Sequence, residues 1–499
     1  MRMRRPTQWL ARMAPRLNSK LMGGASLEAG RRRCPWAAPA PTWGARARAR
    51  GLWLWLWVAC GLGGCASYHA KPLNLDPLLP SDVTRVRVDA ARMPLPELAA
   101  HRFNPAKGLD MTDVAMLAVV GNPQLKLARD AARVSRAQAF SAGLLPYPRL
   151  DLSQDFPTAG PSTSSAFAAG LSYDTAALAT YASRSRAAQA AIRSVDLDLL
   201  WQEWQVVSEA RLLFIRHAEE KALSRLLRAQ QALWRERYRY TRRALAQGNT
   251  TLDVESADLS ALQAVDSALD TDRRKEAGTL HALNALLGLA PETPLDLRGP
   301  TAVPRLTRAD LERALAQLAR RRPDLLALRA GYESEDERYR AAILSQFPAI
   351  GIALNRARDT SDVYTVGYGL TLRLPFFNAS RGRIAVARAT RGALYDAFEV
   401  RVMAAKAQAL RLFADKKMLE AQLAGVRRGV AALDRAVSEA RPAFEAGNIN
   451  ELTFSTLEAS LLDRRIEAVH LEDAIFERAN ALETLVGEQL PNTFRKTQG

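Results

Sequence analysis

The pattern of apolar and polar positions predicts a hairpin of two long coiled-coil helices in the last part of the chain. Apolar residues recur every seven positions at Leu412, Leu419, Val426, Leu433 and Ala440, and the second heptad position is filled by Leu423, Val430, Val437 and Phe444. This 4-3 spacing is typical of a coiled-coil seam. The seam resumes after Gly447-Asn448 at Ala459, Leu462, Ile466 and Val469, is interrupted by Asp473 and continues at Phe476.

A similar pattern appears earlier in the chain. Apolar residues recur with helical spacing at Leu200, Val207, Phe214, Leu226 and Leu233. A helix from Ala179 to Gln247 is about 100 Å long at 1.5 Å per residue. Because glycine adopts the left-handed conformation at a helix end without strain, Gly248 and Gly447 are the expected tips of two hairpins.

The chain repeats itself about 200 residues apart. Four pairs of segments carry the repeat: Asn122-Pro123-Gln124-Leu125 with Arg322-Pro323-Asp324-Leu325, Leu144–Pro148 with Leu344–Pro348, Gly248-Asn249 with Gly447-Asn448, and Leu286-Leu287-Gly288 with Leu485-Val486-Gly487. A solenoid repeats every ~20–50 residues, so this longer period indicates one duplicated architectural unit. We expect two helix–strand–helix halves.

Each half follows one plan. A helix begins near Asp110 in the first half and at Thr307 in the second, where Thr307-x-x-Asp310 resembles a capping box. This helix is expected to run to Pro146 or Pro348, and a pair of strands follows. The expected strands are Leu150–Phe156 and Phe167–Tyr173 in the first half, and Ile350–Leu354 and Tyr364–Leu374 in the second.

The last of these strands alternates clearly. Its apolar residues on one face are Tyr364, Val366, Tyr368, Leu370, Leu372 and Leu374. Alternation over about 10 residues is typical of a membrane-spanning barrel strand. It fits equally well a strand pair packed on a soluble core, so the pattern alone leaves both interpretations open.

The N-terminal region predicts a secretion signal with a lipid anchor. The apolar run 52–64 follows Arg46, Arg48 and Arg50, and it is too short for a helix that spans ~30 Å of hydrocarbon. Leu62-Gly63-Gly64-Cys65 resembles a bacterial lipobox, in which the cysteine becomes acylated, for example with palmitate. An ordinary signal peptide is the alternative. A proline-bearing, extended tether is expected to follow Cys65.

Composition and charge exclude several functions. The net charge is +18, but residues 1–64 alone carry +11, so the remaining 435 residues carry only +7 and no basic region typical of nucleic-acid binding. The three cysteines, Cys34, Cys60 and Cys65, precede the folded body, and the five histidines are scattered. No phosphate-binding loop or hydrolase motif is present. We therefore expect no metal site, no cofactor besides the covalent lipid on Cys65, and no enzymatic activity.

The chain resembles the TolC-type outer-membrane efflux proteins, the outer-membrane factor family, over roughly residues 108–488. The residues that carry the resemblance are Leu109, Ala115-Met116-Leu117, Asn122-Pro123-x-Leu125, Leu311, Arg322-Pro323-Asp324-Leu325, Leu374-Pro375-Phe376-Phe377-Asn378, Gln247-Gly248-Asn249 with Asp253-Val254, and Ala446-Gly447-Asn448. The lipobox and tether add a resemblance to the lipoprotein subgroup.

The resemblance implies a fold that is mainly α-helical with a small membrane β-barrel. Three identical subunits would combine their coiled-coil hairpins into a periplasmic α-barrel under a twelve-stranded β-barrel. The expected organisation is a leader at 1–64, a lipidated extended tether at 65–107, a first repeat at 108–290, a linker at 291–306, a second repeat at 307–488 and a C-terminal tail at 489–499.

The implied function is that of an outer-membrane channel, the exit duct of a tripartite efflux or export system. Its implied partners are a periplasmic adaptor protein, an inner-membrane pump and outer-membrane lipid, with no nucleic acid. The adaptor would contact the hairpin tips at Gly248, Asn249, Gly447 and Asn448. The cargo stays open between drugs, metals and proteins.

Family members often narrow the periplasmic end with acidic side chains just beyond the tips. The candidate aperture acids here are Asp253, Glu255, Asp258, Glu451 and Glu458. The second tip lacks the aspartate that the family pattern places near Thr453, and solvated helix-surface charge is the alternative interpretation.

A lipid-anchored periplasmic coiled-coil scaffold or pump adaptor is the competing interpretation of the whole chain. An adaptor would carry one hairpin beside a lipoyl-like β-domain, whereas this sequence predicts two hairpins.

Overall fold

The computed structural model describes residues 68–159, 164–298, 306–373 and 379–487. The chain divides into two compact units, Met1–Pro77 and Leu78–Gly499. In the first unit, residues 68–77 form neither helix nor strand. The predicted leader, Cys65, the motif at 374–378 and the tail at 489–499 lie outside the described residues.

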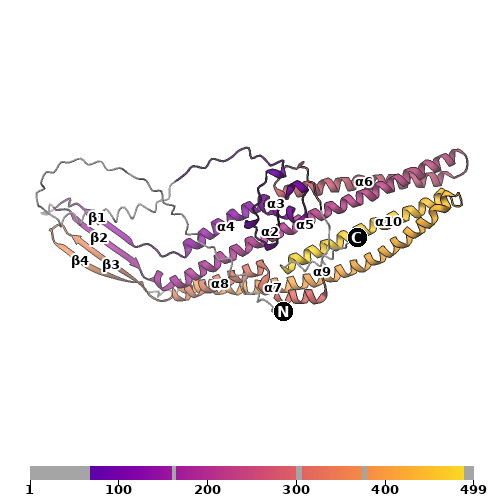
Figure 1. The fold of residues 1–499 in the computed structure, drawn as a ribbon. Coiled ribbons are helices and arrows are strands. Elements are labelled where there is room, and N and C mark those ends of the chain that lie inside the picture. The colour runs from indigo at the N-terminus through magenta and orange to yellow at the C-terminus, as the bar shows by residue number, and fades with distance from the viewer. Residues whose placement is uncertain (1–67, 160–163, 299–305, 374–378, 488–499) are drawn as a thin grey trace, which may run out of the picture. The chain divides into compact units, whose positions relative to one another are not determined.

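The second unit consists of long helices and one antiparallel sheet (Figure 1). The strands are β1 Arg149–Asp155, β2 Ala166–Asp174, β3 Ala349–Arg358 and β4 Tyr364–Arg373, in that order across the sheet. The helices of the first repeat are α3 Met111–Gly121, α4 Pro123–Ala142, α5 Ala176–Ala246 and α6 Leu252–Leu287. Those of the second repeat are α7 Arg308–Arg321, α8 Pro323–Leu344, α9 Ala379–Glu445 and α10 Glu451–Val486. All four predicted strands and both predicted hairpins are confirmed.

The long helices form a wall of neighbours. Next to the sheet, α4 contacts α5, α5 contacts α8, and α8 contacts α9, which is the order of the strands that these helices join. Farther from the sheet, α6 contacts α5, α5 contacts α10, and α10 contacts α9. The long helix α5 therefore packs first on α4 and then, farther from the sheet, on α6. In the same way, α9 packs first on α8 and then on α10. We call the position of this change the junction level.

At this level the structure corrects one prediction. We expected one helix from Asp110 to Pro146, but the chain forms α3 and α4, with a break at Asn122, and the second repeat breaks in the same way at Arg322. Asn122 has ψ of 120°, because a residue before proline is disfavoured in the helical conformation. The predicted capping box at Thr307 and Asp310 is confirmed, and Asp110 with Asp113 forms another.

The ends of α4 and α6 meet closely. The Asn122 side chain accepts a hydrogen bond from the Leu125 backbone at 2.8 Å and donates one to the Leu286 carbonyl at 3.0 Å. A Cβ atom at Gly121 would lie 2.1 Å from the Leu287 carbonyl oxygen. Only glycine fits at this position, because the C-terminal end of α6 lies directly against the N-terminal end of α4.

The segment before α3 differs from the expected extended tether. From Val83 onward it forms short helices, Val83–Arg85, Ala90–Arg92, Pro96–Ala100 (α2) and Pro105–Lys107. Leu95 and Leu98 are buried in a cluster with Met116 and Val119 of α3. A tether away from the body would leave these four apolar side chains in water, which explains why the segment folds back.

Part of the expected linker is hydrogen-bonded to the start of the first repeat. The Leu109 backbone donates a hydrogen bond to the Asp296 carbonyl at 2.7 Å and accepts one from Arg298 at 2.9 Å. This bridge, between Leu109 and Leu297, closes the first repeat after α6. Residues 296–298 of the expected linker therefore pair with the start of the first repeat.

Candidate channel wall and hairpin tips

The strand register separates apolar from polar side chains across the sheet. Pairing of Leu171 with Leu354 and of Leu354 with Tyr368 places these side chains on one face. The same face carries Leu150, Leu152, Phe167, Tyr173, Ile350, Ile352, Tyr364, Val366, Leu370 and Leu372, together with Gln154, Arg356 and Arg358 at the end of the sheet where β3 turns into β4. The opposite face carries small and polar residues, Asp151, Ser153, Ala168, Gly170, Ser172, Gly351, Ala353, Asn355, Thr365, Gly367, Gly369 and Thr371.

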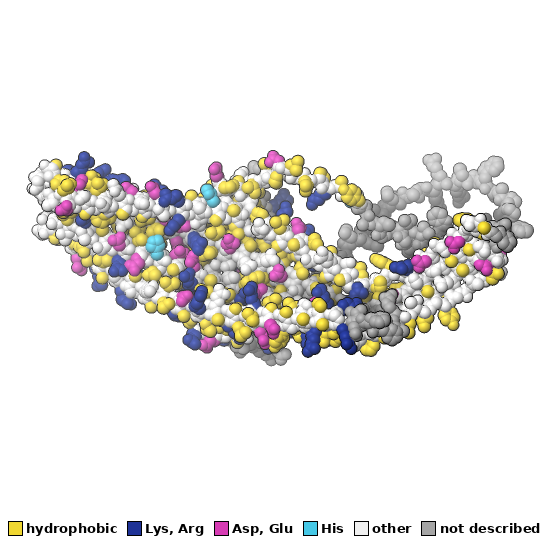
Figure 2. Space-filling view, turned by 180° about the vertical axis from the view of Figure 1, so that it is seen from behind, with side chains coloured by type: hydrophobic (Ala, Val, Ile, Leu, Met, Phe, Trp, Pro, Cys, Tyr) yellow, Lys and Arg dark blue, Asp and Glu magenta, His cyan; other side chains and the backbone are white. Residues whose placement is uncertain are grey.

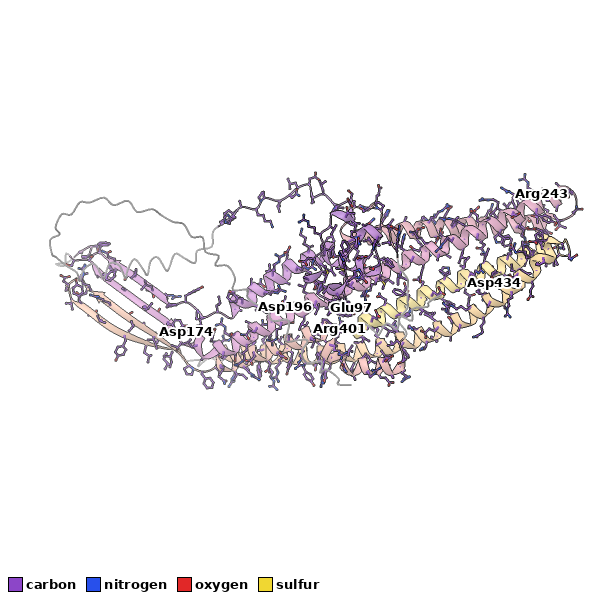
Figure 3. All side chains as sticks on the ribbon, viewed as in Figure 1. Glu97, Asp174, Asp196, Arg243, Arg401 and Asp434 are labelled. Atoms are coloured by element: carbon purple, nitrogen blue, oxygen red, sulfur yellow. The ribbon has the colours of Figure 1, made fainter. Side chains whose placement is uncertain are left out.

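The apolar face is uncovered. Val366 is 83% exposed and Tyr368 is 87% exposed. Side chains of the sheet project from the elements into open space (Figure 3), and hydrophobic side chains gather over the sheet end in Figure 2. Of the two interpretations of the strand alternation, packing on a core formed by the described residues is therefore excluded. An apolar face of this extent is typical of a surface that contacts lipid or protein.

Both edges of the wall also present unpaired groups. Within the described strands, β1 pairs only with β2 and β4 pairs only with β3, so one edge of each is free. On the outer helices, Leu127 and Val134 of α4 are exposed, as are Val400, Met403 and Leu410 of α9. Their recurrence at intervals of seven or three resembles a coiled-coil seam whose partner is missing.

The two hairpin tips share one geometry. In the first, the Asn249 backbone donates to the Ala244 carbonyl at 2.8 Å, with Gly248 at φ +76°. In the second, Asn448 donates to Ala443 at 2.8 Å, with Gly447 at φ +78°. This 6→1 bond after a left-handed glycine is the Schellman motif. The predicted left-handed glycines are confirmed, and all four tip residues are exposed.

The five candidate aperture acids occupy different environments. Asp253 is exposed and Glu255 is half-buried. Asp258 is only 2% exposed and forms an ion pair with Arg237 at 2.8 Å, and Glu458 forms one with Arg441 at 2.8 Å. Burial, with the charges of Glu236 and Glu458 beside it, raises the pKa of Glu451.

Arg237 joins the two hairpins near their tips. Its Nε donates to Asp258 of α6 at 2.8 Å, and its Nη1 donates to Thr456 of α10 at 2.9 Å. Its guanidinium also lies 4.9 Å from the ring centre of Trp234. The sequence analysis missed this contact, because nothing in the local pattern relates Arg237 to Thr456, 219 residues away.

An acidic pair explains the break in the predicted seam at Asp473. Glu219 of α5 is partly buried beside Asp473 of α10, and burial together with this neighbour raises the pKa of Glu219 to about 9. At neutral pH the Glu219 carboxyl therefore holds a proton. Two carboxylates so close cannot both be charged without a large cost.

The second helix junction is built differently from the first. Arg322 takes the place of Asn122 and donates to the Leu485 carbonyl at 3.2 Å. Its guanidinium is also paired with Asp324 at 2.6 Å and lies 4.6 Å from the ring centre of Trp201. A groove of about 620 Å³ opens here between α5, α9 and α10.

One cluster combines a histidine with two acids, which the scattered sequence positions did not predict. His101 Nε2 lies 3.1 Å from Asp113 and 3.5 Å from Asp110. Both carboxylates also accept backbone N–H groups at the start of α3. The helix dipole disfavours a cation there, so we interpret the cluster as an anchor for the segment before α3.

In the described part of the chain, no helix is both long enough and apolar enough to pass through a lipid bilayer.

Comparison with known proteins gives a consistent result. The outer membrane efflux protein family model matches residues 314–488. The solved structure of CusC, described for transmembrane channel formation, is 17% identical, with a TM-score of 0.62 over 84% of this chain and 99% of that one. The outer membrane protein VceC from Vibrio cholerae is 16% identical, with a TM-score of 0.64 over 76% of this chain and 97% of that one. The open state of the Neisseria gonorrhoeae MtrE outer membrane channel is 16% identical, with a TM-score of 0.58 over 87% of this chain and 99% of that one.

No curated protein sequence matches the chain. At these identities the solved structures establish the fold, and the family model adds a sequence match over the second repeat. The resemblance to the TolC-type outer-membrane efflux proteins is confirmed.

Proposed function

We propose that three copies of this outer membrane efflux protein form the exit duct of a tripartite efflux system. The duct would accept solutes from a periplasmic adaptor and an inner-membrane pump and release them outside the cell. The chain would supply a passage and no chemistry.

The observation that carries the proposal is the apolar face of the sheet. Strands β3 and β4 have ten residues each, the length of a tilted strand that crosses a bilayer. Alternation of apolar and polar residues matches a strand with one face on lipid and the other on a water-filled lumen. In hydrocarbon, backbone groups at a free sheet edge would lack hydrogen-bond partners, so such a sheet must close on itself.

Four strands are too few to close a barrel, and the two edges of the wall suggest how closure occurs. The free edge of β1 would pair with β4 of the next copy, and the exposed apolar residues of α4 would pack on those of α9. Such head-to-tail contacts generate a ring when the rotation closes. Three copies would give a twelve-stranded barrel above a helical tube.

Further proposals follow for the two ends of the tube. The tips at Gly248, Asn249, Gly447 and Asn448 would contact the adaptor, and a lipid on Cys65 would add an anchor in the outer membrane. A ring of three Asp253 carboxylates would favour cations through the aperture. Unchanged ion selectivity of Asp253→Ala channels in planar bilayers would count against this ring.

The first experiment measures the mass and shape of the detergent-solubilised protein from the outer-membrane fraction, by light scattering and negative-stain imaging. A particle of three subunits, at least as long as the ~100 Å helices, supports the duct. A monomer, or a protein found only in the soluble periplasm, contradicts it and favours a tethered periplasmic scaffold.

A further inference from the structure

The last turns of α5 carry a row of exposed arginines. We call Arg225, Arg228, Arg235, Arg239 and Arg242 the arginine stripe. All five are exposed, and none forms a salt bridge with a side chain in the described part of the chain. Between residues 225 and 243, Glu236 is the only acidic residue, whereas Arg237 and Arg243 add two more arginines. Figure 3 labels Arg243 at the hairpin end of α5.

The stripe lies on the side of α5 that faces away from α10. Gln230 contacts Asp463 of α10, and Gln231 contacts Asp266 of α6, which fixes the two packed sides of α5. At 3.6 residues per turn, the stripe is roughly opposite Gln230 and next to the side that packs on α6. Asp463 of α10 and Asp266 and Asp258 of α6 bond to Gln230, Gln231 and Arg237 and not to the stripe.

The second repeat provides an internal comparison. The positions of α9 that correspond to the stripe, 199 residues later, are Ala424, Arg427, Asp434, Ser438 and Arg441. Here the charges are mixed and paired: Arg427 with Glu472 at 2.7 Å, Asp434 with Arg465 at 2.6 Å and Arg441 with Glu458 at 2.8 Å. The same helix position is thus neutralised in one repeat and left strongly positive in the other.

Like charges three and four residues apart destabilise a helix, so the stripe opposes folding unless an anion compensates it. We propose that the arginine stripe is a docking surface for an acidic helix of the periplasmic partner. This inference rests on the proposed function, which supplies such a partner next to the hairpin tips. The stripe begins within about two turns of the tip, so the contact would continue along the hairpin from the proposed tip contact.

The spacing favours a helix over other anions. Arg228, Arg235 and Arg242 recur every seven residues, and Arg225 and Arg239 are 14 residues apart. A second helix that packs alongside in a coiled coil presents its flanking charges with the same period, and such pairs select the partner. The stripe is about 26 Å long, or nearly five helical turns, before the hairpin reverses.

The test uses the full-length protein in detergent and a designed helical hairpin as the probe. One form of the probe carries glutamates at seven-residue spacing on its outer face, and its twin carries glutamines. We expect the glutamate form alone to bind, with an affinity that falls as salt rises. The Arg228→Gln/Arg235→Gln/Arg242→Gln variant is expected to bind it about tenfold more weakly.

The matched control is Arg428→Gln/Arg435→Gln in α9. These two arginines are also seven residues apart, exposed and without a salt bridge among the described residues, but they lie outside any longer row. The control is expected to change binding less than twofold. Equal losses in both variants would show non-specific attraction, and heparin binding as strong as that of the acidic hairpin would indicate a flexible polyanion; either result overturns the proposal.

Subunit number separates this inference from the proposed function. Light scattering on each variant is expected to give the mass of the unmodified protein. If the stripe variant falls apart into monomers, the stripe is a contact between copies of the chain and the docking proposal is wrong. If the unmodified protein is itself a monomer, the duct fails, whereas binding of the probe to the stripe is still measured independently.

Discussion

The two hairpins have the same tip geometry but are held together by different chemistry. In the second, Phe454 stacks on Phe444 with ring centres 4.7 Å apart, inside an apolar cluster that includes Val437 and Leu461. In the first, the contacts near the tip are polar: Arg237 to Asp258 and Thr456, Gln231 to Asp266, and Gln230 to Asp463. One duplicated unit has thus reached the same backbone with an aromatic core and ion pairs such as Arg441–Glu458 in one copy, and with ion pairs and hydrogen bonds in the other.

This difference should make the two hairpins respond differently to salt and pH. The second hairpin carries a core of its own near the tip, whereas the first depends on contacts with α10 of its neighbour. Apolar packing does not titrate and is not weakened by charge screening, whereas ion pairs are screened by salt and shared protons respond to pH. We therefore expect the first hairpin to be the adjustable part of the pair.

The largest effect is expected at the apolar tip. Phe454 is 4% exposed, and Phe454→Ala should lower the free energy of unfolding by about 3 kcal/mol, since it leaves a cavity beside Phe444. Chemical unfolding followed by tryptophan fluorescence measures the loss, and hydrogen exchange should localise it to the second hairpin. The corresponding change in the first repeat, Glu255→Ala, should alter stability by less than about 0.5 kcal/mol. Equal effects would mean that the hairpins do not differ as described.

The next effect concerns the polar link between the hairpins. Asp258→Ala leaves Arg237 without its ion-pair partner and should cost about 2 kcal/mol. Exposed Asp253, on the same helix, is the control, and Asp253→Ala should be nearly neutral. A double-mutant cycle with Arg237→Ala measures the coupling. Additive effects of the two substitutions would show that the link contributes nothing.

The shared proton predicts an unusual dependence on pH. Folded Glu219 keeps its proton up to about pH 9, whereas in the unfolded chain the carboxyl has its ordinary pKa of 4.5 and releases the proton there. The folded state binds more protons in this window, so the contribution of Glu219 to stability falls as pH rises from about 5 to 9. Glu219→Gln should flatten this slope and raise stability at pH 8 by about 1.5 kcal/mol. Thermal unfolding between pH 5 and 9 tests this, with exposed Glu209→Gln as the control, and an unchanged slope would refute the shared proton.

The smallest effects should be alike in both hairpins. A Cβ at Gly248 or Gly447 would touch nothing within 4 Å, so only the left-handed backbone resists alanine. Gly248→Ala and Gly447→Ala should each cost about 1 kcal/mol. Thermal unfolding of the two variants measures the costs side by side. A marked inequality would show that one tip makes contacts that the structure does not contain.

The sequence predicted the features that depend on local pattern. The heptads of α9, the tip glycines and the alternation in β4 are each visible within about 30 residues. The repeat also predicted the weaker strands β1 and β2, whose composition alone would not have identified them. What the pattern missed depends on contacts between distant segments.

Three differences illustrate this limit. The helix break before Pro123 was overlooked because the apolar pattern continues across it, although proline restricts the residue before it. Leu95 and Leu98 looked like part of a tether because the surface that covers them, on α3, is not adjacent in sequence. Asp473 looked like a flaw in the seam until Glu219, 254 residues earlier, supplied its partner.

The end-to-end meeting of α4 with α6, and of α8 with α10, has an evolutionary consequence. At this level α6 and α10 end and α4 and α8 begin. The segment before α3, the segment after α6 and the helix α7 are all connected to the long helices at this position. Insertions at these positions can lengthen or decorate a protein of this kind while α5 and α9 continue unbroken. The long helices α5 and α9 can thus be inherited unchanged while the segments that attach at this level diverge.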